Sequence, residues 1–164
     1  MENKHAHRYS EVHGDLIKLT KDGNFDVIVH GNNCFCNMGA GIAVAMAKEF
    51  GCNSYKLEAP ETKGDINKLG QIEYRNYHLP NKNDGRVVVV NAYTQYSPGI
   101  HLKPFDYEAM ALCMKKINHQ FHGLRIGMPM IGAGLAGGDW DRIKQIILDE
   151  LDHVNVTVVI YKKD

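Results

Sequence analysis

The sequence lacks a net charge, because its 19 lysines and arginines balance its 19 aspartates and glutamates. Proteins that are attracted to nucleic acid or to a membrane surface by their net charge carry a clear excess of basic residues. The balance therefore argues against both kinds of partner, and nucleic acid is not indicated.

Long apolar segments are also absent. No run of about 18 apolar residues occurs, which is the length that a membrane-spanning helix needs. The first residues, Met1-Glu2-Asn3-Lys4-His5, contain no signal-peptide core. We therefore expect no contact with a membrane and a cytoplasmic location.

Cysteine is scarce, with Cys34, Cys36, Cys52 and Cys113 as its four occurrences. Cys34 and Cys36 are too close for an ordinary disulfide, and a cytosolic chain keeps its thiols reduced. His30 could join these two cysteines around zinc, but a second Cys or His pair at matching spacing is missing. We expect no metal site and no cofactor.

The most informative stretch runs from Val27 to Phe50. It opens as an apolar, β-branched strand, continues through the polar pair Asn32-Asn33 and reaches Gly39-Ala40-Gly41 before a segment of helical spacing. The unpaired N–H groups of a first helical turn attract anions, and glycine lets backbone approach a phosphate closely. Taken alone, the motif is better interpreted as a tight connection between strand and helix than as an anion site.

A second stretch repeats this arrangement between Met128 and Trp140. A strand end is followed by four glycines within Gly132 to Gly138, and then by a helix. Ligands of α/β proteins bind at the carboxyl ends of the strands. Two glycine loops at that edge predict a site for one extended phosphate ligand, held from both sides.

Strand patterns alternate with helical patterns along the whole chain. We expect strands at 8–13, 26–29, 71–74, 86–92, 125–130 and 154–161, and helices at 42–50, 105–121 and 140–151. Pro80 to Gly85 predicts a hairpin turn, and hence some antiparallel pairing. The sequence therefore predicts an α/β protein with one domain over residues 1–164, a three-layer α/β/α sandwich around a mixed sheet.

The order of these motifs resembles that of a macro domain. The matching segments are Gly14-Asp15-Leu16 after the first strand, Val29-His30-Gly31-Asn32-Asn33, Gly39-Ala40-Gly41-Ile42-Ala43, and Pro129-Met130-Ile131-Gly132-Ala133-Gly134-Leu135 with Trp140. The match covers nearly the whole chain, with the expected element between each pair of motifs. The resemblance implies the three-layer fold and a ligand that is ADP-ribose or a derivative of it.

The resemblance also implies roles for single residues. Asp15 would accept a hydrogen bond from the adenine amino group, with the Leu16 backbone beside it, and Asn33 would bind the distal ribose. Backbone amides of two loops would hold the diphosphate and the distal ribose; these loops are Gly39, Ala40, Gly41 and Ile42, and Ile131, Gly132, Ala133, Gly134, Leu135, Ala136 and Gly137. Without the resemblance, Asp15 and Asn33 would read as residues that form local turns.

Macro domains include hydrolases, phosphatases and readers that perform no chemistry. The branch that removes ADP-ribose from acidic side chains typically has an aspartate where this chain has Ala43. The terminal ADP-ribose glycohydrolases use a lysine and an aspartate where Thr94 and Ala136 align. The pattern is closest to the ADP-ribose-1″-phosphate phosphatases.

We therefore expect hydrolysis of the phosphate of ADP-ribose-1″-phosphate, with His30, Asn33 and Asp139 as the catalytic residues. His30 could instead cap strand carbonyls, and Asp139 could cap the following helix. Two alternatives stay open: a reader of free ADP-ribose or ADP-ribosylated protein, and a hydrolase that removes ADP-ribose from protein. Trp140 and Tyr161 are expected in the core.

Overall fold

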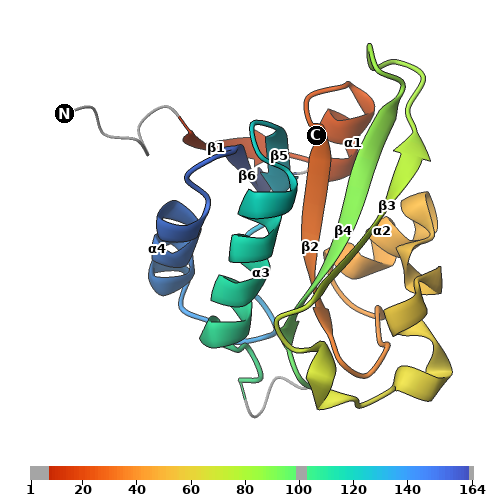
Figure 1. The fold of residues 1–164 in the computed structure, drawn as a ribbon, viewed down its shortest axis with the longest axis vertical. Coiled ribbons are helices and arrows are strands. Elements are labelled where there is room, and N and C mark those ends of the chain that lie inside the picture. Colours follow the sequence, from red (N-terminus) through yellow and green to blue (C-terminus); the bar gives the residue numbers. More distant parts are fainter. Residues whose placement is uncertain (1–7, 99–102, 163–164) are drawn as a thin grey trace.

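A computed structural model describes residues 8–98 and 103–162 of the chain (Figure 1). Six strands form one sheet in the order β1-β6-β5-β2-β4-β3. The strands are β1 (Tyr9–Gly14), β2 (Val27–Asn33), β3 (Ile72–His78), β4 (Arg86–Gln95), β5 (Arg125–Met128) and β6 (Asn155–Tyr161). The helices are α1 (Leu16–Lys21), α2 (Ile42–Phe50), α3 (Tyr107–Gln120) and α4 (Trp140–Glu150).

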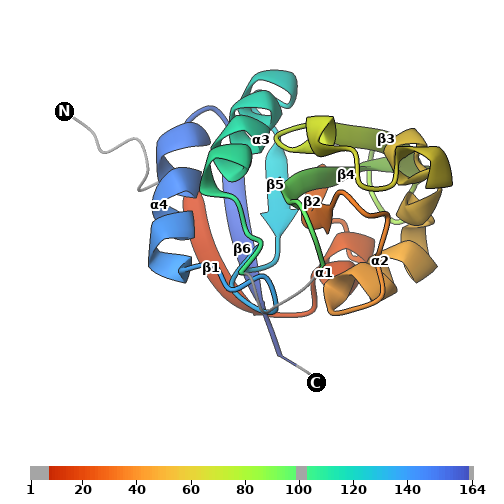
Figure 2. The ribbon, with the colours of Figure 1, turned by 90° about the horizontal axis from the view of Figure 1, so that it is seen from below.

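The helices cover both faces of the sheet. Figure 2 shows α3 and α4 on one side, and α1 and α2 on the other. Four 3₁₀ turns extend the α2 layer: η1 (Cys52–Ser54), η2 (Lys56–Glu58), η3 (Pro60–Thr62) and η4 (Ile66–Lys68). The predicted three-layer α/β/α fold is confirmed.

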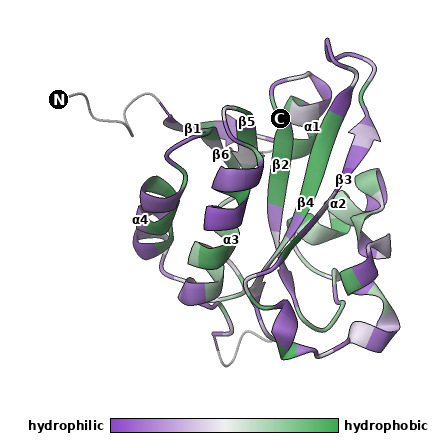
Figure 3. Cartoon of the chain, in the orientation of Figure 1, coloured by the Kyte–Doolittle hydropathy of each residue, from purple (hydrophilic) through white to green (hydrophobic). Residues whose placement is uncertain are grey.

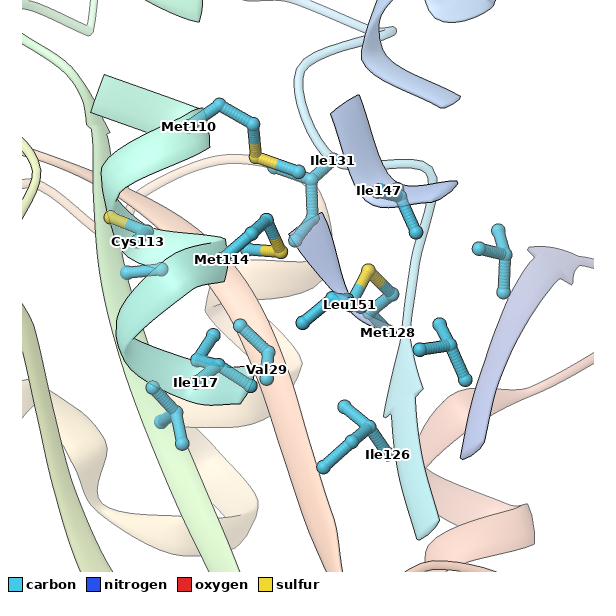
Figure 4. Close-up of a cluster of buried hydrophobic side chains, with 14 of the residues drawn as sticks. Val29, Met110, Cys113, Met114, Ile117, Ile126, Met128, Ile131, Ile147 and Leu151 are labelled. Atoms are coloured by element: carbon cyan, nitrogen blue, oxygen red, sulfur yellow. The ribbon is translucent and has the colours of Figure 1, made fainter. Parts of the chain in front are cut away.

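Each helical layer has its own core against the sheet. On the α3 and α4 side, Met114 and Ile117 pack toward Val29 and Ile126 (Figure 4). On the other side, Met46 and Phe50 of α2 pack in one buried cluster with apolar side chains of β2 and β4. Apolar residues therefore dominate the middle of these two strands (Figure 3).

The pairing of the strands decides where a ligand can bind. All neighbours are parallel except β3 and β4, whose antiparallel hairpin closes with a hydrogen bond of 2.8 Å from Leu79 N to Gly85 O. The mixed sheet that Pro80 to Gly85 predicts is therefore present. The parallel strands end at one common edge, where loops can gather around a ligand.

Some elements differ from the prediction. Strand β2 continues through His30 and both asparagines, and β4 extends to Gln95. Both strands are longer than predicted because they stay paired with each other as far as Asn33 and Gln95. The short helix α1, capped by Asp15, was not predicted. Within the described ranges, none of the helices has the length and apolar character to cross a membrane.

Candidate ligand-binding cleft

Two adjoining cavities lie at the carboxyl edge of the parallel strands. The first, of about 660 Å³, lies beyond β1 and β6, and the second, of about 490 Å³, lies beyond β2 and β4. Gly41, Ile42 and Gly134 line both cavities, which therefore form one cleft. We call the two parts the proximal and the distal compartment, and these three residues the junction.

The proximal compartment is mainly apolar. Its lining consists of Gly14, Asp15, Leu16, Ile17, Ala45, Pro129, Met130, Ala133, Val159 and Tyr161, together with the junction. Tyr161 is 71% exposed, so its predicted place in the core is wrong. It is the last residue of β6, where the strand runs past the layer that would have covered it. An apolar slot with one acidic side chain suits a flat heteroaromatic group that carries an amino donor.

Asp15 is the one carboxylate among the described residues that line the cleft. As N-cap of α1, its Oδ1 accepts hydrogen bonds from Ile17 N at 2.9 Å and from Lys18 N at 3.3 Å. The local role of this aspartate is therefore to cap α1, where the sequence alone indicated a turn. Both bonds use Oδ1, and within the described residues no partner engages Oδ2, so this oxygen can accept from a ligand.

The two glycines of the junction present backbone to the cleft. Gly41 is the N-cap of α2 and has φ 61° and ψ −147°, a conformation that is essentially restricted to glycine. No side chain caps this helix, so its first N–H groups, beside the cleft, have no side-chain acceptor at the cap. A Cβ at Gly134 would meet no atom within 4 Å. Backbone donors on open space are what a diphosphate requires.

The distal compartment has amide side chains but no ionisable side chain among the described residues that line it. Its lining consists of Gly31, Asn33, Asn37, Gly39, Ala40, Ala43, Gln95, Pro98, Gly132, Leu135 and Ala136, together with the junction. Asn33 donates to Asn37 O at 2.8 Å and accepts from Phe35 N at 2.9 Å, which folds the loop after β2. Asn33 therefore has two roles: it stabilises a local turn and it lines the distal compartment.

His30 does not reach the cleft. Its side chain is fully buried, lines neither compartment, and donates from Nε2 to Asn91 Oδ1 at 2.7 Å. Burial lowers the pKa of His30 to about 4, although the hydrogen bond to Asn91 acts in the opposite direction. The side chain of His30 therefore faces away from the cleft, because successive side chains of β2 alternate between the faces and His30 points into the α2 layer with Cys52.

Asp139 is also outside the cleft. It is the N-cap of α4, and its Oδ1 accepts from Asp141 N at 3.1 Å. Its backbone N–H donates to the Tyr107 hydroxyl at 2.9 Å. Of the two roles considered for Asp139, the structure shows the cap, and its side chain lines neither compartment.

Most of the predicted ligand-binding residues do meet in the cleft. Those that line it are Asp15, Leu16, Asn33, Gly39, Ala40, Gly41, Ile42, Gly132, Ala133, Gly134, Leu135 and Ala136. Ile131 does not, because its side chain belongs to the core below (Figure 4). Gly137 does not either: its φ is 75° and a Cβ there would crowd Lys103.

Several lining residues were not predicted from the sequence. They are Gly14, Ile17, Gly31, Asn37, Ala43, Ala45, Gln95, Pro98, Pro129, Met130, Val159 and Tyr161. Gln95 and Tyr161 are the last residues of β4 and β6, so the rule that ligands bind at strand ends could have identified them. In the described ranges, no group of three or more His, Cys, Asp or Glu side chains is placed to hold a metal ion.

Comparison with known protein sequences gives two informative relatives. No family model matches the chain. A 17.5 kDa protein from the tk-vs intergenic region of Enterobacteria phage T4 is 33% identical over 156 residues, which cover 90% of this chain and 93% of the phage protein. ADP-ribose glycohydrolase OARD1 of Bos taurus is 27% identical, over 98% of this chain and 95% of that protein.

Comparison with solved structures shows the same fold in proteins of low sequence identity. Thermosipho africanus DarTG in complex with ADP-ribose superposes with a TM-score of 0.72 at 17% identity, over 100% of this chain and 45% of that chain. The macrodomain of Thermus aquaticus DarG superposes with a TM-score of 0.63 at 20% identity, over 94% of this chain and 98% of that chain.

Proposed function

We propose that the chain, which has the fold of the macrodomains, is a macro domain that recognises ADP-ribose in the two-compartment cleft. In this proposal adenine occupies the proximal compartment beside Asp15, the diphosphate lies at the junction, and the distal ribose enters the distal compartment. The DarTG structure with this fold holds ADP-ribose, which supports the choice of ligand.

The single observation that carries the proposal is the continuity of the cleft. Gly41, Ile42 and Gly134 line both compartments, so one ligand can extend from one into the other. A diphosphate between two ribose-containing halves has that extended form. The unpaired N–H groups at the start of α2 place donors where its charge would lie.

Recognition without fast chemistry is the function that the geometry favours. General acid–base catalysis needs a titratable group within hydrogen-bond reach of the reacting atoms. The distal compartment offers Asn33, Asn37 and Gln95 instead, and Ala136 lines it where glycohydrolases of the family carry an aspartate. The relative OARD1 is a glycohydrolase, whereas the family resemblance puts Thr94 and Ala136 where terminal glycohydrolases carry their lysine and aspartate.

The second candidate is slow release of phosphate from ADP-ribose-1″-phosphate. The amide lining of the distal compartment favours it, because amides can hold both a phosphate and a water molecule. The anomeric leaving oxygen is comparatively good, so positioning alone could give slow turnover. ADP-ribosylated protein would enter the same compartment through its terminal ribose.

Calorimetry with three ligands tests the proposed recognition. ADP-ribose should bind with low- to mid-micromolar affinity, which corresponds to about −7 to −8 kcal/mol. AMP, which fills only the proximal compartment, should bind at least about tenfold more weakly, and ribose 5-phosphate more weakly still. Absence of heat with millimolar ADP-ribose would overturn the proposal.

A further inference from the structure

The four cysteines differ sharply in their access to solvent. Cys34, Cys52 and Cys113 are fully buried, whereas the Cys36 side chain is partly exposed. Burial raises the pKa of Cys34 and of Cys52 to about 11, and that of Cys113 to about 12. Since the thiolate is the species that reacts with oxidants, these three thiols should be inert. Cys36 is the candidate for modification.

Cys36 lies against a buried amine. Lys68, which is 2% exposed, donates from Nζ to Cys36 Sγ at 3.3 Å and to Cys34 O at 3.2 Å. No carboxylate of the described residues forms a salt bridge with Lys68. The buried Glu58 binds the Tyr93 hydroxyl instead, and burial raises the pKa of Glu58, which favours its neutral form. Within the described residues, the Lys68 amine is therefore hydrogen-bonded to the Cys36 sulfur and to a carbonyl oxygen rather than to a carboxylate.

We propose that Cys36 and Lys68 form a peroxide-sensitive modification site, in which the amine of Lys68 captures oxidised Cys36 as a sulfur–nitrogen bridge. Peroxide transfers one oxygen to sulfur, so that the thiol becomes a sulfenic acid and the peroxide is reduced to water. The Lys68 nitrogen gives up a proton to solvent and attacks the sulfur. The S–N bond forms, the S–O bond breaks, and the oxygen leaves as water.

The surroundings hold the two groups in place for this reaction. The Cys36 sulfur also contacts Ala59 O at 3.4 Å and Leu57 O at 3.6 Å, so it cannot turn away freely. Cys36 has φ 58°, a left-handed conformation that is unusual for a residue other than glycine. It directly precedes Asn37, which lines the distal compartment. The bridge would thus fasten the loop beside the cleft to η4.

Mass spectrometry of the peroxide-treated protein tests the bridge. Under non-reducing conditions the intact mass should fall by two hydrogen atoms, and trypsin should release one joined peptide pair linked through Cys36 and Lys68, uncut after Lys68. Dithiothreitol should restore the original mass. Oxidation that maps first to Cys34, Cys52 or Cys113, or a Cys36 sulfenic or sulfinic acid beside a free Lys68, would overturn the proposal.

Two variants separate the partners. In Lys68→Arg the cation stays but the nucleophilic amine is lost, so Cys36 should gain oxygen and react with dimedone without a loss of two hydrogens. Cys36→Ser should form no bridge, whereas Cys113→Ser should form it as the wild type does. The wild-type peptide map decides the matter by itself if Lys68→Arg does not fold. A bridge that persists in Cys36→Ser would contradict the assignment.

Discussion

His30 and Asn91 form a hydrogen bond of 2.7 Å inside the core, where both side chains are fully buried. Asn91 in turn donates to Cys52 O at 3.0 Å, which fixes η1 on the sheet. Burial lowers the pKa of His30 from its ordinary value of 6.5 to about 4. The unfolded chain therefore binds a proton between these two pH values that the folded chain does not bind.

This difference makes stability depend on pH. The free energy of unfolding should be highest above pH 6.5 and should fall by about 3 kcal/mol from His30 alone as the pH drops toward 4. Urea unfolding at pH 7 and at pH 4.5 measures the effect. His30→Gln, which can still donate to Asn91, should remove most of this slope; an unchanged slope would show that other groups cause it.

Asp15 should contribute to affinity through the base of the ligand. Asp15→Ser keeps an N-cap for α1 but cannot reach the adenine amino group, so it should weaken ADP-ribose binding by about 1–3 kcal/mol without unfolding the helix. The hypoxanthine analogue, which lacks that amino group, serves as the control in calorimetry. Equal losses for the two ligands would mean that Asp15 does not read the base.

Gly134 offers the cleanest test of the junction. A Cβ there would meet no atom within 4 Å and no left-handed φ is required, whereas Gly41, at φ 61°, would add backbone strain to any substitution. Gly134→Glu places a carboxylate where the diphosphate should lie and should lower affinity by at least about tenfold, while Gly134→Ala should bind nearly as the wild type does. Circular dichroism confirms folding. Wild-type affinity in Gly134→Glu would show that this loop does not face the phosphates.

Release of phosphate from ADP-ribose-1″-phosphate should be slow or absent, and any turnover should survive EDTA. Although the sequence suggested a catalytic role for His30, its buried position predicts that replacing it leaves the rate of phosphate release unchanged. His30→Gln and Asp139→Ser, which retains the helix cap, should keep the wild-type rate in a phosphate-release assay, because neither side chain lines the cleft. A loss of about 10²-fold in either variant would be typical of a general acid or base and would contradict this geometry.

The glycine loops could be predicted from the sequence because the strand and the helix on either side of each loop are close in the chain. Gly41 and Gly134 both lie in such a loop. The direction of the His30 side chain could not be predicted, because it depends on strand pairing between segments far apart in the sequence. With a strand assumed to end at Val29, His30 would open a loop and could point anywhere. Once pairing with β4 extends the strand to Asn33, the alternation of β2 directs His30 away from Val29 and into the α2 layer.

Much of the lining of the proximal compartment could not be predicted from the sequence for a related reason. Met130 and Val159 come from separate strand ends that only the order of the sheet brings together with α1 and α2. Tyr161 ends an apolar strand, so its composition indicates the core although its position at the edge exposes it. Helix α1 is six residues long and too short for a helical period to stand out.

Backbone amide NMR during titration with ADP-ribose tests the central claim most directly. One saturating ligand should shift amides of both compartments together, with the largest changes at Asp15, Gly41, Gly134 and Asn33, and little change at His30. Shifts confined to one compartment, or gathered on the surface away from the carboxyl edge of the sheet, would contradict it.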